Sequence, residues 1–197
     1  ESASSGKAVS VWDNQYMIIP LDRPEGGTSL DDETYTYSPN DITPADVDGD
    51  GEYELILKWE PSNSFDSGKD ARHNGNVYID CYKMNGTKLW RIDMGMNINA
   101  GAHFTQMAAY DFDLDGKAEI ALKTAPGTKD GKNNYVSEAS SIEEIKNTDN
   151  SADYRHDKNG GDTGGRVLSG DEYYTVFQGN TGEALDTIYY PHLRGAI

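Results

Sequence analysis

Two stretches of the chain repeat one another and decide its fold. Residues 45–58 read ADVDGDGEYELILK, and residues 110–123 read YDFDLDGKAEIALK. In both stretches three aspartates stand at alternate positions, a glycine and a glutamate follow, and an apolar run ends in lysine. Because the two copies align in register, the chain contains at least two similar structural units.

Each copy is followed by the pattern of a β-hairpin. In the first unit, residues 77–81 form a β-type run that leads to Asn85-Gly86, and residues 89–92 form the returning run. Asn-Gly is the strongest short signal for a β-hairpin. Residues 173–189 repeat this plan around Asn180-Thr181-Gly182. Each unit therefore reads strand, acidic loop, strand, long loop, strand, tight turn, strand.

Four antiparallel strands per repeat predict an all-β fold in which each unit is one blade of a β-propeller. We expect a lead-in segment with edge strands at 1–39, one blade at 40–102 and a second blade at 103–197. An α/β fold is disfavoured, because tight hairpin turns do not join parallel strands. A helix-like stretch at 136–147 is expected inside the second long loop.

Two blades cannot close a ring, and repeat proteins generally need roughly three or more repeats for stability. We therefore expect the chain to be part of a larger propeller. The remaining blades would come from further sequence of the parent protein or from another chain.

The charge balance narrows the class of partner. Lys and Arg number 17 against 34 Asp and Glu, which gives a formal net charge of −17. Nucleic-acid binding requires clustered basic residues, so we expect no nucleic-acid partner. Anionic membrane surfaces are disfavoured for the same reason, and the sequence has no apolar stretch near the roughly 20 residues of a membrane helix.

The acidic loops have the donors that Ca²⁺ prefers, namely several oxygens from carboxylates and backbone carbonyls. In each loop we expect three aspartates, the backbone carbonyl of the seventh residue and the glutamate at the ninth position to surround the ion. The strands that follow distinguish these loops from an EF-hand, whose loop joins two helices. The alternative is an acidic turn without a metal. The predicted ligands are Asp46, Asp48, Asp50, Glu52 and Glu54 in the first loop, and Asp111, Asp113, Asp115, Lys117 and Glu119 in the second.

The strand order also predicts which loops lie together. An acidic loop between the first and second strands shares one end of the blade with the tight turn between the third and fourth strands. The opposite end receives the long loops at 60–76, 94–102 and 125–171, and long structured loops are usually functional. Asn40 and Asp41 precede the first strand and Glu60 ends the second, so we expect them to be neighbours at this end. The long loops themselves contain His73, Arg155 and His156, and a lone loop histidine is more often solvated than catalytic. His103, at the start of a strand, could be a ligand, a substrate contact or a packed histidine.

Several further motifs carry a family resemblance over most of the chain, from about Trp12 to Tyr190. They are Tyr35-Thr36-Tyr37-Ser38, Asn40-Asp41, residues 46–59, Pro61-Ser62-Asn63-Ser64, residues 75–80, Leu89-Trp90-Arg91-Ile92-Asp93, residues 100–106, Ala152-Asp153-Tyr154-Arg155 and residues 166–170. Together these motifs resemble the bacterial rhamnogalacturonan lyases of polysaccharide lyase family eleven. The family usually has aspartate where this chain has Glu60, and the tail at 191–197 fits less well.

The resemblance implies a secreted enzyme with a calcium-rich, eight-bladed propeller, of which this chain would supply early blades. It also implies cleavage of the rhamnogalacturonan I backbone of pectin by β-elimination at galacturonic acid, with calcium neutralising the uronate carboxylate. By family position Asn40 and Glu60 would contact the substrate, and no residue here is marked as the catalytic base. The competing interpretation is a non-catalytic calcium-stabilised propeller module for adhesion or glycan binding.

Overall fold

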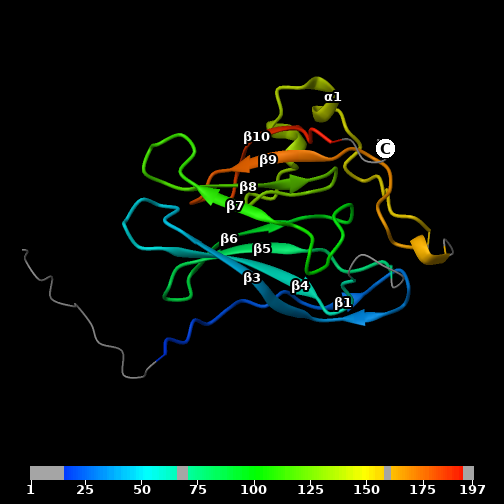
Figure 1. Cartoon of the computed structure of the whole chain (residues 1–197), viewed down its shortest axis with the longest axis horizontal. Coiled ribbons are helices and arrows are strands. Elements are labelled where there is room, and N and C mark those ends of the chain that lie inside the picture. The colour runs from blue at the N-terminus through cyan, green and yellow to red at the C-terminus, as the bar shows by residue number, and fades with distance from the viewer. Residues whose placement is uncertain (1–15, 66–70, 158–160, 193–197) are drawn as a thin grey trace, which may run out of the picture.

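The computed structural model describes residues 16–65, 71–157 and 161–192, and in them the chain is built mainly of antiparallel strands (Figure 1). A short two-stranded sheet contains β1 (Gly27–Thr28) and β2 (Thr34–Tyr35). The first four-stranded sheet contains, in order, β3 (Tyr37–Ala45), β4 (Glu54–Pro61), β5 (Tyr78–Tyr82) and β6 (Lys88–Asp93). The second contains β7 (Met107–Tyr110), β8 (Glu119–Thr124), β9 (Tyr173–Phe177) and β10 (Ala184–Tyr189).

The predicted order of strands and loops is confirmed in both units. Sequential strands pair antiparallel in each four-stranded sheet, and the acidic loops join β3 to β4 and β7 to β8. The fold is thus all-β with antiparallel sheets. Both sheets are open in the described part of the chain, with β3 and β6 at the edges of one and β7 and β10 at the edges of the other.

The helical prediction at 136–147 is only partly correct. The segment forms two short pieces, a 3₁₀ turn at Val136–Ala139 and α1 at Glu143–Lys146. Ser140 separates them in extended conformation, with its hydroxyl donating to the Thr187 carbonyl at 2.6 Å and accepting from the Ile142 N–H at 3.1 Å. A serine side chain that binds nearby backbone competes with helix continuation, which explains the break. A second 3₁₀ turn lies at Gly161–Thr163.

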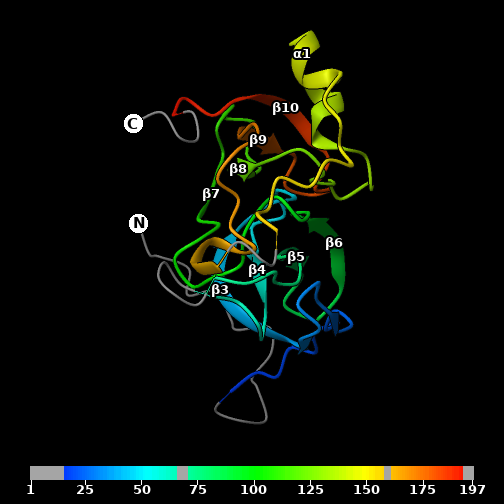
Figure 2. The same cartoon turned by 90° about the vertical axis from the view of Figure 1, so that its right-hand side faces the viewer.

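The main hydrophobic core lies between the two four-stranded sheets, which Figure 2 shows stacked one above the other. Ile56, Ile79 and Ile92 of the first sheet face Ile120 and Leu122 of the second, and all are buried. Burial of side chains of this size contributes about 1.5–3 kcal/mol each, so this interface is the main source of stability of the pair. None of the described helices is long or apolar enough to cross a membrane.

The opposite face of the first sheet is covered by the lead-in segment. Trp59 and Tyr82 on this face are buried, and both donate a hydrogen bond to the buried carboxylate of Asp80, at 2.8 and 2.6 Å. Arg91 pairs with both oxygens of the same carboxylate at 2.7 Å and also donates to the Asp22 carbonyl at 2.6 Å. The buried Asp80 carboxylate is thus paired with Arg91 and hydrogen-bonded by its neighbours. Through Arg91 this ion pair also holds the lead-in segment to the sheet.

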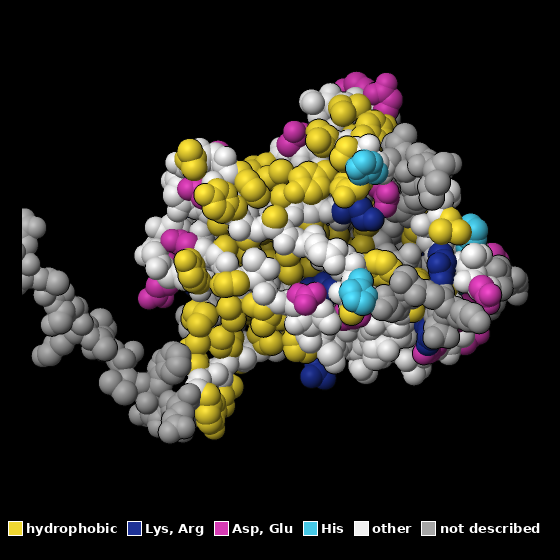
Figure 3. Space-filling model, in the orientation of Figure 1, with side chains coloured by type: hydrophobic (Ala, Val, Ile, Leu, Met, Phe, Trp, Pro, Cys, Tyr) yellow, Lys and Arg dark blue, Asp and Glu magenta, His cyan; other side chains and the backbone are white. Residues whose placement is uncertain are grey.

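The outer face of the second sheet has no such cover in the described residues. Tyr110 and Ile188 on this side are 65 % and 45 % exposed. A groove of about 570 Å³ runs along it, lined by residues that include Ala108, Ala121 and Tyr174. Figure 3 shows hydrophobic side chains on the surface over the strands of both four-stranded sheets.

Candidate functional site

The first acidic loop is a series of turns in which aspartate side chains accept backbone N–H groups. Asp46 accepts from Gly49 at 2.7 Å and from Gly51 at 2.9 Å, with both glycines at positive φ. Asp48 accepts from Asp50, and Asp50 accepts from the Glu52 N–H at 2.8 Å. One carboxylate oxygen each of Asp46, Asp48 and Asp50 lies within 4.8 Å of the others. A donor set of clustered carboxylates suits a hard divalent cation.

The second loop repeats this arrangement. Asp111 accepts from Asp115 at 3.1 Å and from Gly116 at 2.9 Å, and Asp115 accepts from the Lys117 N–H at 2.8 Å. The aspartates Asp111, Asp113 and Asp115 again bring one oxygen each within 4.8 Å. Leu114 takes the positive φ that Gly49 has in the first loop, and its side chain is 81 % exposed. The loop geometry therefore does not depend on glycine at this position.

The glutamates at the ninth position hold the loops closed. Glu54 is buried and accepts the Val47 N–H at 3.0 Å, and Glu119 accepts the Phe112 N–H at 2.9 Å. Burial raises the pKa of Glu54, and the neighbouring Asp48 carboxylate adds to this, although the bond from Val47 opposes it. One oxygen of each glutamate is thus committed to the backbone. The described metal-capable groups consist of the three aspartates of each loop.

The tight turn between β5 and β6 lies at the same end of the sheet as the first acidic loop, as predicted. Lys83 begins this turn, and its Nζ lies 2.5 Å from Asp48 and 3.2 Å from Asp50. These carboxylates raise the pKa of Lys83. The two acidic loops are also neighbours, because the Ala118 N–H donates to the Asp46 carbonyl at 2.8 Å.

The predicted substrate contacts lie at the other end of the first sheet, around a buried lysine. The expectation that Asn40 and Asp41 precede the first strand is wrong, because β3 already begins at Tyr37. The register of β3 shifts between Pro39 and Ile42, so the two residues stand at an irregularity within the strand. The Lys58 side chain is 1 % exposed, and its Nζ lies 3.1 Å from Asp41 and 3.7 Å from Glu60. Asn40 and Asp41 are solvent-exposed, whereas the Glu60 side chain is 11 % exposed.

Lys58 also connects this cluster to the segment between the sheets. Its Nζ donates to the carbonyls of Phe104 at 3.1 Å and Gly101 at 3.4 Å. Glu60 Oε2 is buried without a hydrogen-bond partner. This is the oxygen that lies 3.7 Å from Lys58 Nζ, so the lysine charge offsets the cost of burying it without a hydrogen bond. The residue pattern did not reveal the role of Lys58, although a lysine in a buried apolar strand is a signal in itself.

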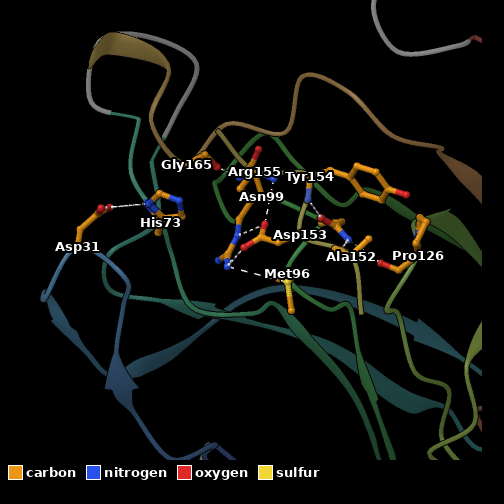
Figure 4. Close-up of polar contacts among 11 residues, drawn as sticks. Asp31, His73, Met96, Asn99, Pro126, Ala152, Asp153, Tyr154, Arg155 and Gly165 are labelled. Carbon is orange, nitrogen blue, oxygen red and sulfur yellow. Dashed lines mark hydrogen bonds and ion pairs between the residues drawn. The ribbon is translucent and has the colours of Figure 1, made fainter. Parts of the chain in front are cut away.

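The long loops are joined to one another by side-chain bonds to backbone (Figure 4). Asn97 donates to the carbonyls of Pro126 and Ala152, both at 2.9 Å, and Asn99 donates to the Gly165 carbonyl at 2.9 Å. These long-range bonds hold the loop between β6 and β7 against three separate parts of the long loop between β8 and β9, at the end opposite the acidic loops. Sequence reasoning missed both asparagines.

Two of the candidate loop residues are engaged within the fold. The buried His73 meets Asp31, whose carboxylate also accepts the His73 N–H at 2.7 Å. Arg155 forms a two-pronged pair with Asp153, at 2.9 and 2.8 Å, and this pair lowers the pKa of Asp153. Figure 4 shows both pairs, and they give His73 and Arg155 structural roles within the fold. His156 approaches Thr163 Oγ1 at 3.0 Å.

The groove on the outer face of the second sheet holds a different charged pair. Lys123 lies 2.8 Å from Glu172 and 5.9 Å from the centre of the Tyr190 ring. His103 lines the same groove. Lys123 stands at the repeat position of Lys58, so the same residue closes an interface in one unit and lines an open surface in the other.

Comparison with known proteins gives the family. The family model described as rhamnogalacturonan lyase family 11, C-terminal domain, matches residues 16–197. The chain belongs to rhamnogalacturonan lyase family 11. The predicted resemblance is thereby confirmed.

Individual family 11 lyases are similar over nearly the whole chain. The chain is 53 % identical to the rhamnogalacturonan endolyase YesW of Bacillus subtilis over 100 % of this chain. It is 51 % identical to the rhamnogalacturonan exolyase YesX of the same organism over 97 % of this chain. The crystal structure of YesW superposes with a TM-score of 0.83 over 94 % of this chain and 29 % of that chain. The PL11 lyase of Bacillus licheniformis, 50 % identical, gives 0.82 over 96 % of this chain and 29 % of that chain.

The chain spans only 29 % of YesW and 28 % of YesX. The sheets and loops described above therefore correspond to a part of each of these family 11 lyases.

Proposed function

We propose that the chain forms part of a pectin-degrading lyase that cleaves the rhamnogalacturonan I backbone by β-elimination at galacturonic acid. The observation that supports this most is the 53 % and 51 % identity to a rhamnogalacturonan endolyase and a rhamnogalacturonan exolyase. The substrate is an acidic polysaccharide, and the protein acts as a secreted, extracellular enzyme. No residue of the described chain is assigned as the base that removes the C5 proton.

The cation of the acidic loops is calcium in this proposal. The three aspartates of each loop fit it, because one oxygen from each lies within 4.8 Å of the others and bonds from backbone N–H groups orient the carboxylates. Asp46, Asp48 and Asp50 would hold one ion, and Asp111, Asp113 and Asp115 the other. The carbonyls of Glu52 and Lys117, with Glu54 and Glu119 behind them, complete the proposed sites. Calcium supplies charge neutralisation here, which stabilises the ends of the sheets.

The substrate lies at the opposite end, against Asn40 and Glu60. The Asn40 amide can donate to and accept from sugar hydroxyls, and the Glu60 carboxylate can accept one. Lys58 holds the Glu60 carboxylate from behind and keeps Asp41 beside it. A chain of net charge −17 needs cations where it meets a polyanion. Positive charge that neutralises the uronate carboxylate also makes the C5 proton more acidic.

The two sheets are two blades of a larger β-propeller in this proposal, with blades at 40–102 and 103–197 and a lead-in at 1–39. The groove beside Lys123 and the exposed Ile188 form the surface on which the next blade packs. The comparison of the units supports this. Lys58 donates to the carbonyls of Gly101 and Phe104 in the segment that leads into the second sheet. Lys123 occupies the equivalent repeat position of the second unit, facing the side where the next blade would lie.

The experiment measures the ultraviolet absorbance of the 4,5-unsaturated uronate released from rhamnogalacturonan I by the parent protein. We expect absorbance to rise on this polymer, to stay flat on homogalacturonan, and to be lost in chelator and restored by calcium. The variants Asn40→Ala and Glu60→Ala should raise KM. Binding of the polymer without absorbance would instead indicate a non-catalytic glycan-binding propeller.

A further inference from the structure

The two acidic loops differ in the positive charge that surrounds them. Lys83 Nζ lies 2.5 Å from Asp48, 3.2 Å from Asp50 and 3.7 Å from Glu54 of the first loop. In the part of the chain that the structure describes, no lysine or arginine forms an ion pair with the three aspartates of the second loop. The loops are alike in backbone but not in charge.

The difference arises at a single position of the tight turn. In the first unit the Lys83 N–H donates to the Thr87 carbonyl at 2.9 Å, and in the second unit the Gln178 N–H donates to the Glu183 carbonyl at 2.8 Å. Lys83 and Gln178 therefore occupy equivalent places at the start of their turns. Gln178 uses its side-chain oxygen to accept from Thr181 at 3.0 Å, and it brings no charge to the second loop.

The lysine of the second loop does not replace the missing charge. Lys117 lies toward the first loop, since a Cβ placed on Gly49 would come within 3.1 Å of Lys117 Cγ. The first loop thus has two lysine side chains beside it, one of them bonded to its aspartates.

We propose that the Lys83 ammonium group is a tethered cation that occupies the first acidic loop in competition with calcium, so the first loop binds calcium more weakly than the second and keeps its shape without it. The inference rests on the proposed calcium sites. An ammonium group at 2.5–3.2 Å from two ligands offsets part of the repulsion among the carboxylates. Calcium must displace the Lys83 ammonium group or bind beside it. Either event reduces the affinity of the first loop for calcium. In the second loop no described lysine or arginine offsets the charge of the aspartates, so calcium would be the cation that organises this loop.

The test exchanges the two side chains and measures each loop separately. Asp111→Asn leaves the first loop as the site to be titrated, and Asp46→Asn leaves the second. Calcium is titrated calorimetrically into the chain in each background. Lys83→Gln should tighten calcium binding at the first loop by about fivefold or more, and Gln178→Lys should weaken it at the second loop by a similar factor. Lys88→Gln, which removes an exposed lysine paired with Asp22, is the matched control and should change neither affinity.

Thermal unfolding in chelator gives a readout that does not require metal binding. Lys83→Gln should lower the unfolding midpoint more than Lys88→Gln does, and calcium should restore it. Unchanged or weaker calcium binding in Lys83→Gln would overturn the inference while leaving the calcium sites intact. If neither loop binds calcium, the proposed metal sites fail, and equal midpoints for the two lysine variants in chelator would then also exclude the tethered cation.

Discussion

At the scale of single residues, Lys58 is the least expected feature of the chain. Its ammonium group is nearly inaccessible to water, yet it meets Asp41, Glu60 and two backbone carbonyls. A buried lysine is tolerated only when its charge and its donors are matched. This matching depends on the carbonyls of Gly101 and Phe104, which come from beyond the first sheet, so the local sequence could not reveal it.

Replacing Lys58 should be costly for stability in a way that replacing Lys123 is not. Lys58→Met leaves buried acceptors and the Glu60 carboxylate without their cation, and we expect a loss of about 3 kcal/mol or more in the free energy of unfolding. Lys123→Met removes a partly exposed ion pair and should cost about 1 kcal/mol or less. Urea unfolding of both variants measures the difference. Equal losses would show that Lys58 is not buried in the folded chain.

Two aspartates should show opposite dependence on pH. Burial raises the pKa of Asp93, so its charged form disfavours folding at neutral pH, whereas the Arg155 pair lowers the pKa of Asp153. Asp93→Asn should therefore raise stability at pH 7, and this gain should vanish as the pH falls below the ordinary aspartate pKa of about 3.9. Asp153→Asn should lower stability at pH 7, by less than about 1 kcal/mol because the pair is partly exposed, and the loss should shrink as the pH falls through the lowered pKa. Urea midpoints measured from pH 3 to 7 test both signs, and gains of the same sign in both variants would contradict the assignment.

At the scale of elements, the strands and turns with local signals were predictable. Asn85-Gly86 fixes its turn through backbone preference, and the alternation of aspartate and glycine fixes the acidic loops, so both are found where expected. The helix at 136–147 was overpredicted because Ser140 binds a carbonyl of β10 that is remote in sequence. The layer built by Asn97 and Asn99 was not predictable for the same reason, since the carbonyls that they bind lie in the loop between β8 and β9, remote in sequence. The aspartate trios form as expected, and calcium and the sugar contacts remain predictions.

The interface between the sheets should be sensitive to loss of volume at β8. Ile120 is fully buried between the sheets, and Ile120→Ala should cost about 2–5 kcal/mol in the free energy of unfolding. Trp90→Phe at the same interface removes the bond from the indole N–H to the Gly179 carbonyl at 2.7 Å, and should cost about 1–3 kcal/mol. Denaturant unfolding of the chain measures both. A cost below about 0.5 kcal/mol for Ile120→Ala would mean that the sheets do not pack through this face.

At the scale of the whole molecule, the outer faces of the two four-stranded sheets differ in how far they are covered. The lead-in covers the first sheet through Asp22 and Arg91, whereas Tyr110 and Ile188 on the second sheet remain exposed. The matched relatives are more than three times as long, since the chain covers 28–29 % of them. A sheet that leaves one face bare is what a repeat array shows where the next repeat is missing.

This asymmetry leads to a comparison between the chain and its parent protein. Ile188→Glu places a charge on the exposed face, and in the chain alone it should change the free energy of unfolding by no more than about 0.5 kcal/mol, as is usual for surface positions. In the propeller proposed for the parent protein the same glutamate would be buried against the next blade without a partner, and thermal unfolding should show a much larger loss. Leu30→Glu, at an exposed turn beside the two-stranded sheet, is the control and should be tolerated in both. Equal tolerance of Ile188→Glu in the chain and in the parent would mean that this face stays open in the complete enzyme, and the groove beside Lys123 would then be available to ligand rather than to a blade.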